Sequence, residues 1–395
     1  MRSILSVFHN HVFIYLSIFS IFINTSCSEP EENSLGTYES VTYKIDLEHN
    51  TKGLSPSQYT IDSVCSLSVP DSMGIFEISK FVVKDGRIYA LDSEITRRLF
   101  VFDTNGNYLF RLGDRGRAQF EYVGGPKDFF VDELDEIHVF DPMGLKIVVF
   151  KKDGTIDRIV RVNHTYPYSI GVLTYKRNLY CLYNTKIDAN KPNVALLARD
   201  HSGENRQELL YMDHDDYFSS SVQNFFKNGD RLSHIPIMSD SVLVFKKDSL
   251  EKVVRFDFGG KFLLKERPEL VTIQGRQKDI SQYNGVWELS KYQETDSLIL
   301  LEYTYNRKSM LWLYNKQTKQ IINSNQILNG LCPFYDFYLR DNQIITIVQK
   351  EMVDFYKKKL DDEEFKKQLT KAPSQIRDII EGKIPTPAIF FITIK

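Results

Sequence analysis

A repeat of nearly fifty residues is the feature that most restricts what this chain can fold into. The segment Lys80–Gly113 (KFVVKDGRIYALDSEITRRLFVFDTNGNYLFRLG) aligns with Lys127–Val162 (KDFFVDELDEIHVFDPMGLKIVVFKKDGTIDRIVRV). Ile88 in the first copy matches Ile137 in the second, 49 residues later, and a glycine turn recurs at a separation of 48. A period in this range is typical of solenoids and propellers.

Each copy contains four short apolar runs. In the first copy they are about Phe81–Val83, Arg87–Leu91, Leu99–Asp103 and Tyr108–Leu112. Asp85-Gly86 and Asn105-Gly106 separate some of these runs. Asx-Gly between apolar runs indicates a hairpin, because the favoured tight turns need a positive φ. The repeat therefore predicts a four-stranded antiparallel meander, which is one blade of a propeller.

Fainter copies of the second strand of this meander recur along the chain. Besides the strands at Ile88 and Ile137, they are Asn178–Tyr183, Ser241–Phe245, Ser297–Leu301 and Gln343–Val348. Six such strands predict an all-β fold, a six-bladed β-propeller over residues 41–395. Five or seven blades stay open as alternatives, because the third to fifth copies are degenerate.

The two ends of this domain each supply an unpartnered strand. Ile389–Thr393 (IFFIT) lies almost at the C-terminus, and Val41–Leu47 (VTYKIDL) precedes the first blade. We expect these two strands to pair and close the ring, since closure removes an open sheet edge.

A helical insertion is expected in the last blade, over about residues 357–382. The acidic residues 361–364 suit the N-terminus of a helix. Phe365 and Leu369 are four residues apart and would face the propeller together. A second short helix is expected from Ser374 to Glu381, with Gly382 ending it.

The N-terminus resembles a bacterial lipoprotein signal. Arg2 precedes an apolar run, HVFIYLSIFSIFI, which is too short for a comfortable membrane span, and NTSC follows with Cys27 as its last residue. The resemblance implies a signal peptide over 1–26 and a lipid on Cys27. The acidic segment 27–40 would be a flexible tether. The alternative is an ordinary secretory signal with an incidental cysteine.

The chain as a whole resembles the six-bladed β-propeller lipoproteins of Bacteroidetes, relatives of the NHL-repeat propellers. The resemblance rests on IYALD, LFVFDTNGNYLFRLG, PAIFFITIK and the loop ending in Glu121-Tyr122. That family's loop commonly reads G-x-G-P-G-E-Y; Gly116, Glu121 and Tyr122 match, whereas residues 118–120 depart from it. The resemblance implies an outer-membrane lipoprotein, on the surface or the periplasmic face, and no defined activity.

Composition and motifs exclude several function classes. The formal net charge is −2, so no nucleic-acid partner is expected. No cofactor, catalytic or metal motif is present, and the loop 113–126 lacks the following helix that a phosphate-binding turn needs. Among scattered histidines, His164 and His234 are the best candidates for an axial metal. Cys65, Cys181 and Cys332 are expected as buried thiols, with one disulfide as the alternative.

One set of side chains is expected around the channel mouth. It comprises Arg115, Arg117, Tyr122, His164, Tyr166 and Tyr168. Arginine and aromatic side chains stack on and hydrogen-bond to sugars and peptides. The alternative is that these residues only pack the loops together.

These observations predict a monomeric propeller that binds a ligand or a protein partner in the cell envelope. A carbohydrate, a peptide or an envelope protein fits the expected residues, and the membrane would be contacted through the lipid anchor alone. Two alternatives stay open: a metal-dependent hydrolase or lyase at the axial channel, and a structural subunit of a larger envelope complex.

Overall fold

The computed structural model describes most of one compact unit, Glu39–Lys395. The described residues are 38–48, 53–70, 73–74, 77–161, 170–175, 177–182, 194–199, 206–211, 225–236, 239–246, 249–266, 283–325 and 336–395. Within them, no helix is both long enough and apolar enough to cross a membrane. Cys27, His164, Tyr166 and Tyr168 lie outside these residues.

The strands form six sheets, and four of them are antiparallel meanders of four consecutive strands. Blade 1 contains β3 (Lys80–Lys84), β4 (Arg87–Asp92), β5 (Arg98–Asp103) and β6 (Tyr108–Leu112). Blade 2 contains β7 (Asp128–Val131), β8 (Ile137–Asp141), β9 (Lys146–Phe150) and β10 (Ile156–Arg161). Blade 3 contains β11 (Ile170–Tyr175), β12 (Arg177–Leu182), β13 (Val194–Arg199) and β14 (Arg206–Tyr211), and blade 5 contains β19 (Val286–Glu294), β20 (Leu298–Tyr305), β21 (Lys308–Asn315) and β22 (Ile321–Ser324).

The other two sheets combine distant parts of the chain. Blade 4 contains β15 (Phe225–Asn228), β16 (Arg231–His234), β17 (Ser241–Lys246) and β18 (Ser249–Asp257), with β1 (Glu39–Lys44) added outside β18. Blade 6 contains β23 (Asp336–Arg340), β24 (Gln343–Val348), β25 (Ala388–Ile394) and β2 (Tyr59–Ser66). A short helix, α2 (Leu263–Glu266), follows blade 4.

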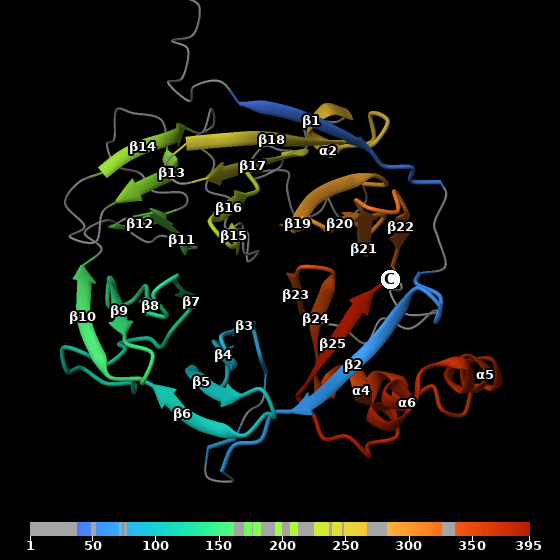
Figure 1. The fold of residues 1–395 in the computed structure, drawn as a ribbon, viewed down its shortest axis with the longest axis horizontal. Coiled ribbons are helices and arrows are strands. Elements are labelled where there is room, and N and C mark those ends of the chain that lie inside the picture. The colour runs from blue at the N-terminus through green and yellow to red at the C-terminus, as the bar shows by residue number, and fades with distance from the viewer. Residues whose placement is uncertain are drawn as a thin grey trace, which may run out of the picture. The chain divides into compact units, whose positions relative to one another are not determined.

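The innermost strands surround a common axis. Each of β3, β7, β11, β15, β19 and β23 contacts the next, and β23 contacts β3. Figure 1 shows the sheets arranged around this centre. The fold is therefore a β-propeller of four-stranded antiparallel blades, and the first copies of the repeat form blades 1 and 2 as expected. One of the six predicted second strands is wrong. Ser241–Phe245 lies in β17, the third strand of blade 4, because the shorter strand β16 precedes it.

An N-terminal strand pairs with the C-terminal strand, but it is not the one expected. β2 pairs with β25 in antiparallel fashion, from Tyr59 opposite Ile394 to Ser66 opposite Ala388. The expected partner, Val41–Leu47, instead overlaps β1, which runs parallel to β18. The physical reason is burial: Tyr59, Ile61 and Cys65 of β2 are buried, whereas β1 lies at an edge with exposed alternate residues.

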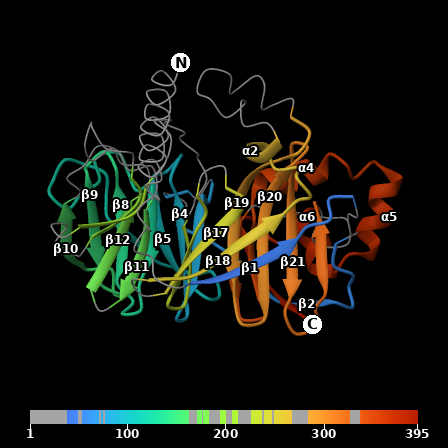
Figure 2. The same cartoon turned by 90° about the horizontal axis from the view of Figure 1, so that it is seen from above.

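The insertion in blade 6 contains three helices, beside the last blade in Figure 2: α4 (Lys350–Lys357), α5 (Glu363–Lys371) and α6 (Ser374–Ile380). It begins earlier than the expected residue 357, because α4 directly follows β24. Phe365 and Leu369 are buried in the same apolar cluster as β24 and β25 residues, as predicted. Asp362 caps α5 by accepting from the amides of Glu364 and Phe365.

Substitution of Gly106 should test how closely blades 1 and 6 approach. A Cβ at Gly106 would lie 2.0 Å from the Ser66 carbonyl oxygen, whereas a Cβ at Gly86 would meet nothing within 4 Å. Both glycines have positive φ. We therefore expect Gly86→Ala to lower the free energy of unfolding by about 1 kcal/mol and Gly106→Ala by roughly 2 kcal/mol more. Urea denaturation measures both, and equal losses would contradict the close approach.

Candidate functional site

The axis of the propeller contains a cavity of about 200 Å³. Its wall comes from the innermost strands of blades 1, 2, 4, 5 and 6. Aromatic side chains form most of the apolar part: Phe81, Phe129, Phe130, Phe226, Phe337 and Tyr338. Four lysines share the wall with them: Lys80, Lys84, Lys227 and Lys291. A small cavity that combines rings with a few charged groups has the composition of a ligand site.

Two of these lysines belong to a unit that occurs twice around the axis. Lys80 of β3 donates to Asp128 Oδ1 of β7 at 2.6 Å, and its Nζ lies 5.5 Å from the centre of the Phe129 ring. Lys291 of β19 likewise pairs with Asp336 of β23 and lies 4.6 Å from the Phe337 ring. In each unit, a lysine from one blade reaches the Asp-Phe pair that begins the next innermost strand.

The aspartates of these units are fixed by the strands that carry them. Asp128 Oδ1 also accepts the Phe129 amide at 2.7 Å, and Asp336 Oδ1 accepts the Phe337 amide at 2.8 Å. Each carboxylate is thus held at the first residue of its strand and neutralises one lysine. Such units link neighbouring blades at the axis.

Burial changes the proton affinity of two of the axial lysines, Lys291 and Lys227. Removal from water lowers the pKa of Lys291 to about 8, with Glu302 opposing the shift and Lys80 adding to it. Burial also lowers the pKa of Lys227, although Glu133 opposes this. The ammonium groups of these two lysines are therefore poorly hydrated and lie in a medium where an added charge would interact strongly.

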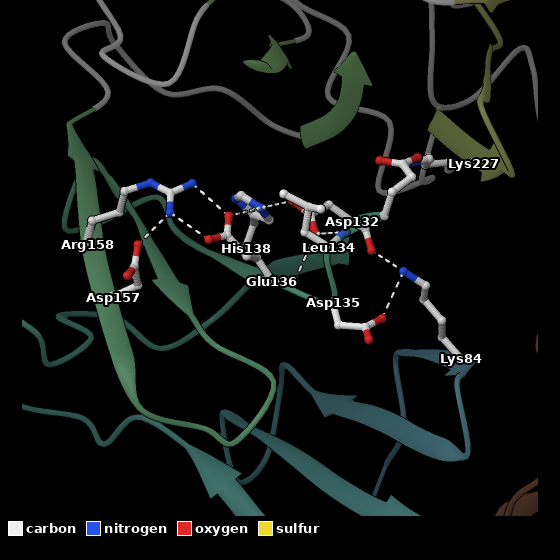
Figure 3. Close-up of polar contacts among 10 residues, drawn as sticks. Lys84, Asp132, Leu134, Asp135, Glu136, His138, Asp157, Arg158 and Lys227 are labelled. Carbon is white, nitrogen blue, oxygen red and sulfur yellow. Dashed lines mark hydrogen bonds and ion pairs between the residues drawn. The ribbon is translucent and has the colours of Figure 1, made fainter. Parts of the chain in front are cut away.

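A second charged feature is the acidic hairpin, residues 132–136 between β7 and β8. Figure 3 shows basic groups from several elements facing its carboxylates. Lys84 lies 3.1 Å from Asp135, Lys152 lies 2.6 Å from Asp135, and Lys227 pairs with Glu133. The lysines of β3 and β15 thus connect blades 1 and 4 to this hairpin of blade 2. Burial opposes the ionised form of Asp135, but its hydrogen bonds with Lys152, Asp85 and Lys84 and the charge of Lys84 lower its pKa to about 2.

The hairpin and the adjoining strand β8 together contain the one group of metal-ligating atoms found among the described residues. Ligand atoms of Asp132, Glu136 and His138 lie within 4.8 Å of one another. Asp132 and His138 are almost fully buried, and His138 Nε2 lies 3.2 Å from Asp132 Oδ2. Sequence reasoning missed this group, although Asp132, Glu136 and His138 are close in sequence around a tight turn.

The carboxylates of this group are already engaged by the protein. Asp132 Oδ1 accepts the amides of Leu134 and Glu136 at 2.9 Å each. Both oxygens of Glu136 accept from the Arg158 guanidinium, at 2.8 and 2.9 Å. Although burial opposes it, the bond from His138 and these amides lower the pKa of Asp132. A metal would lie beside the positive charge of Arg158, so the arrangement favours a structural role in the hairpin over an open metal centre.

Residues 69–378 match the family described as "Domain of unknown function (DUF4934)". The chain belongs to this family. No curated protein matches the chain.

Solved structures share the fold of this DUF4934 protein. A protein from Bacteroides fragilis that its name describes as exported has a TM-score of 0.66 and 17% identity, and the match covers 90% of this chain and 99% of that one. A member of the DUF4221 family from Bacteroides vulgatus has a TM-score of 0.48 at 10% identity, covering 86% and 98%. A virginiamycin B lyase from Staphylococcus aureus has a TM-score of 0.40 at 10% identity, covering 80% of each chain. At these identities, the likeness concerns the fold alone.

The loop 113–126 connects β6 of blade 1 to β7 of blade 2, as the sequence predicts. The backbone of Tyr122 pairs with that of Arg115 in an isolated bridge. Asp141 accepts the Val123 amide at 2.7 Å, and Lys146 donates to the Gln119 carbonyl at 2.8 Å. The loop of this DUF4934 chain is therefore fastened to blade 2.

The expected ligand-binding set is only partly placed by the structure. Arg115 and Arg117 are exposed, and their role in binding stays a prediction. Tyr122 does not lie on the surface as expected: it is 1% exposed and packs in the apolar cluster between blades 1 and 2. The bridge to Arg115 turns the chain back, and the Tyr122 ring then fills the space over Gly113.

The remaining predicted residues are outside the expected site or outside the described residues. His164, Tyr166 and Tyr168 are not among the residues that the structure describes, so their role in binding stays a prediction. His234, an expected metal candidate, is buried, and the group described above does not include it.

Tyr122 should behave as a core residue. Its buried hydroxyl has no hydrogen-bond partner in the part of the chain that the structure describes. Tyr122→Phe should therefore leave the free energy of unfolding unchanged or raise it by up to about 1 kcal/mol, while Tyr122→Ala should lower it by about 3–5 kcal/mol. Urea denaturation of the two variants measures this difference. A marked loss in Tyr122→Phe would show that the hydroxyl has a partner.

Proposed function

We propose that this chain is an exported six-bladed β-propeller that binds a small ligand in its axial cavity. The observation that carries the proposal is the cavity of about 200 Å³ whose wall combines aromatic rings with lysine–carboxylate pairs. The innermost strands hold these groups on a rigid ring, so the site is formed before a ligand arrives. Preformed sites bind well because little conformational entropy is lost on binding.

Stability alone does not account for charges at the axis. Buried ion pairs cost desolvation energy, and well-packed apolar residues often stabilise a protein as much or more. The clusters between neighbouring blades follow this rule, since they consist of apolar and aromatic residues, mainly Val, Ile, Leu and Phe. Four lysines line the axial cavity instead, on or beside the innermost strands. Polar groups retained around a hollow axis are therefore best explained by contact with a ligand.

The cell envelope is the proposed location. The signal-like segment 1–26, Cys27 as the lipid-bearing residue and the acidic tether support anchoring in the outer membrane. A similar solved structure belongs to a protein named as exported. The exposed Arg115 and Arg117 would allow a second mode of binding on the same propeller. Their partner would be an envelope protein, a peptide or a carbohydrate.

A binding protein is preferred here to a metal-dependent hydrolase or lyase. The alternative needs a metal with an open coordination position for the substrate. The candidate ligands Asp132, Glu136 and His138 are engaged with the backbone and with Arg158. A ligand that binds in the axial cavity requires no change in these contacts.

A variant that fills the cavity should separate binding there from binding elsewhere. Val82 lines the cavity from β3, so Val82→Phe would occupy part of its volume. We expect small-molecule fragments to bind the wild-type protein, detected by ligand-observed NMR, and most to be lost in Val82→Phe. Ile156→Phe, on the exposed edge of blade 2, is the control and should retain them. Fragments that bind Val82→Phe and wild type equally, or no fragment binding at all, would overturn the proposal.

A further inference from the structure

We propose that the axial cavity takes a small organic carboxylate, whose anionic group lies between Lys80 and Lys291 and whose apolar body lies on the phenylalanine rings. This inference rests on the proposed function and adds the chemical class of the ligand. It is carried by the hydrogen-bonding capacity that remains at these two lysines.

The ammonium groups of Lys80 and Lys291 each have donors to spare. An ammonium group has three N–H donors. Among the described residues, Lys80 donates to Asp128 and Lys291 to Asp336, and no second acceptor is found for either. Both side chains line the cavity. Two donors on each lysine are thus available to an acceptor that enters the cavity.

The position of the two lysines favours one shared anion. β3 and β19 carry them, and β23 lies between, because it contacts both strands. Lys80 also lowers the pKa of Lys291, so the two positive charges repel each other across this part of the cavity. A carboxylate between them would replace that repulsion with two attractions, and it would do so where hydration is weak.

The other lysines of the cavity offer less to a ligand. Lys84 binds Asp135 and the backbone carbonyl of Asp132, and Lys227 binds Glu133. These contacts hold the acidic hairpin, which brings several carboxylates together, whereas Lys80 and Lys291 each pair with a single carboxylate. The side of the cavity toward blades 1, 5 and 6 is therefore the one that suits a carboxylate.

The rest of the wall and the size of the cavity limit the ligand further. Phe81, Phe129 and Phe337 provide flat apolar surface beside the lysines. A volume of about 200 Å³ is below the roughly 300–1,000 Å³ of sites for drug-sized molecules. A single ring or short aliphatic chain with one carboxylate fits these limits.

Three probes of one shape distinguish the ligand class. Phenylacetate, phenylacetamide and phenethylamine carry an anionic, a neutral and a cationic group on the same ring. Calorimetry with wild-type protein at pH 7 should give at least tenfold tighter binding for phenylacetate than for the other two. Equal or tighter binding of the amide or the amine would overturn the carboxylate while leaving the cavity as a binding site. No binding of any probe would also overturn it, and the fragment experiment would then decide the proposed function separately.

Paired substitutions test the role of the lysines without leaving a buried charge alone. Lys291→Met with Asp336→Asn, and Lys80→Met with Asp128→Asn, should each reduce the preference for phenylacetate over phenylacetamide at least tenfold. Binding of the amide should persist, which shows that the cavity is intact. Lys367→Met, exposed on α5, is the matched control. Unchanged preference in both double variants would contradict the assignment.

The affinity for phenylacetate should fall as the pH rises from 7 to 10. Burial places the pKa of Lys291 near 8, so this lysine loses its positive charge within that range, while phenylacetate stays ionised. The charged groups facing Lys291 are Asp336 from β23, Lys80 from β3 and Glu302 from β20. Binding of phenylacetamide should not change, and the Lys291→Met/Asp336→Asn variant should lose the pH dependence. A flat profile for phenylacetate in wild type would contradict the role of Lys291.

Discussion

The pairing of β2 with β25 is the constraint on which the remaining structure depends. These strands lie more than 300 residues apart in sequence, and their register joins the two ends of the propeller in one sheet. Without this pairing, blade 6 would keep only β23, β24 and β25, and β25 would present an open edge. Closure also fixes the axis, because every innermost strand then has a neighbour on both sides. Groups at the axis can be held rigidly only in a closed ring, so the cavity depends on a strand pair at the outer rim.

The sequence predicts most of the fold because the repeat is a local pattern. Blades 1 and 2 follow from alternating apolar runs and Asx-Gly turns, and the strands of blade 1 agree with the predicted ranges within one residue. The closing strand could not be identified in the same way. Both Val41–Leu47 and Tyr59–Ser66 can form a strand, and the choice depends on how each packs against the helices and blade 6. α4 was not predicted for a related reason: the acidic residues 361–364 indicate the N-terminus of a helix, whereas the segment just after β24 has no comparable local signal.

The site was harder to predict than the fold, since its parts lie far apart in the sequence. Arginines and aromatic residues in two interblade loops predicted a binding set at the channel mouth, but Tyr122 of that set is a core residue. The axial lysines gave no local signal, because Lys80 and Asp128 are 48 residues apart and Lys291 and Asp336 are 45 apart. These separations are close to the period of the repeat. A search for opposite charges at that spacing, with the aspartate at the first residue of an innermost strand, would have found both pairs.

The same spacing explains how a fold with no catalytic motif can acquire a binding site. Each repeat places the first residues of its innermost strand at the axis, and the Asp-Phe pair occupies this place in blades 2 and 6. A lysine on the preceding blade then meets a carboxylate and an aromatic ring without any further change in the backbone. Since the carboxylate uses only one of the three donors of the lysine, the pair links two blades and still leaves capacity for a ligand. Blades 1 and 5 supply such lysines on either side of blade 6. Substitutions in individual repeats would therefore be sufficient to place the charged groups on one side of the cavity.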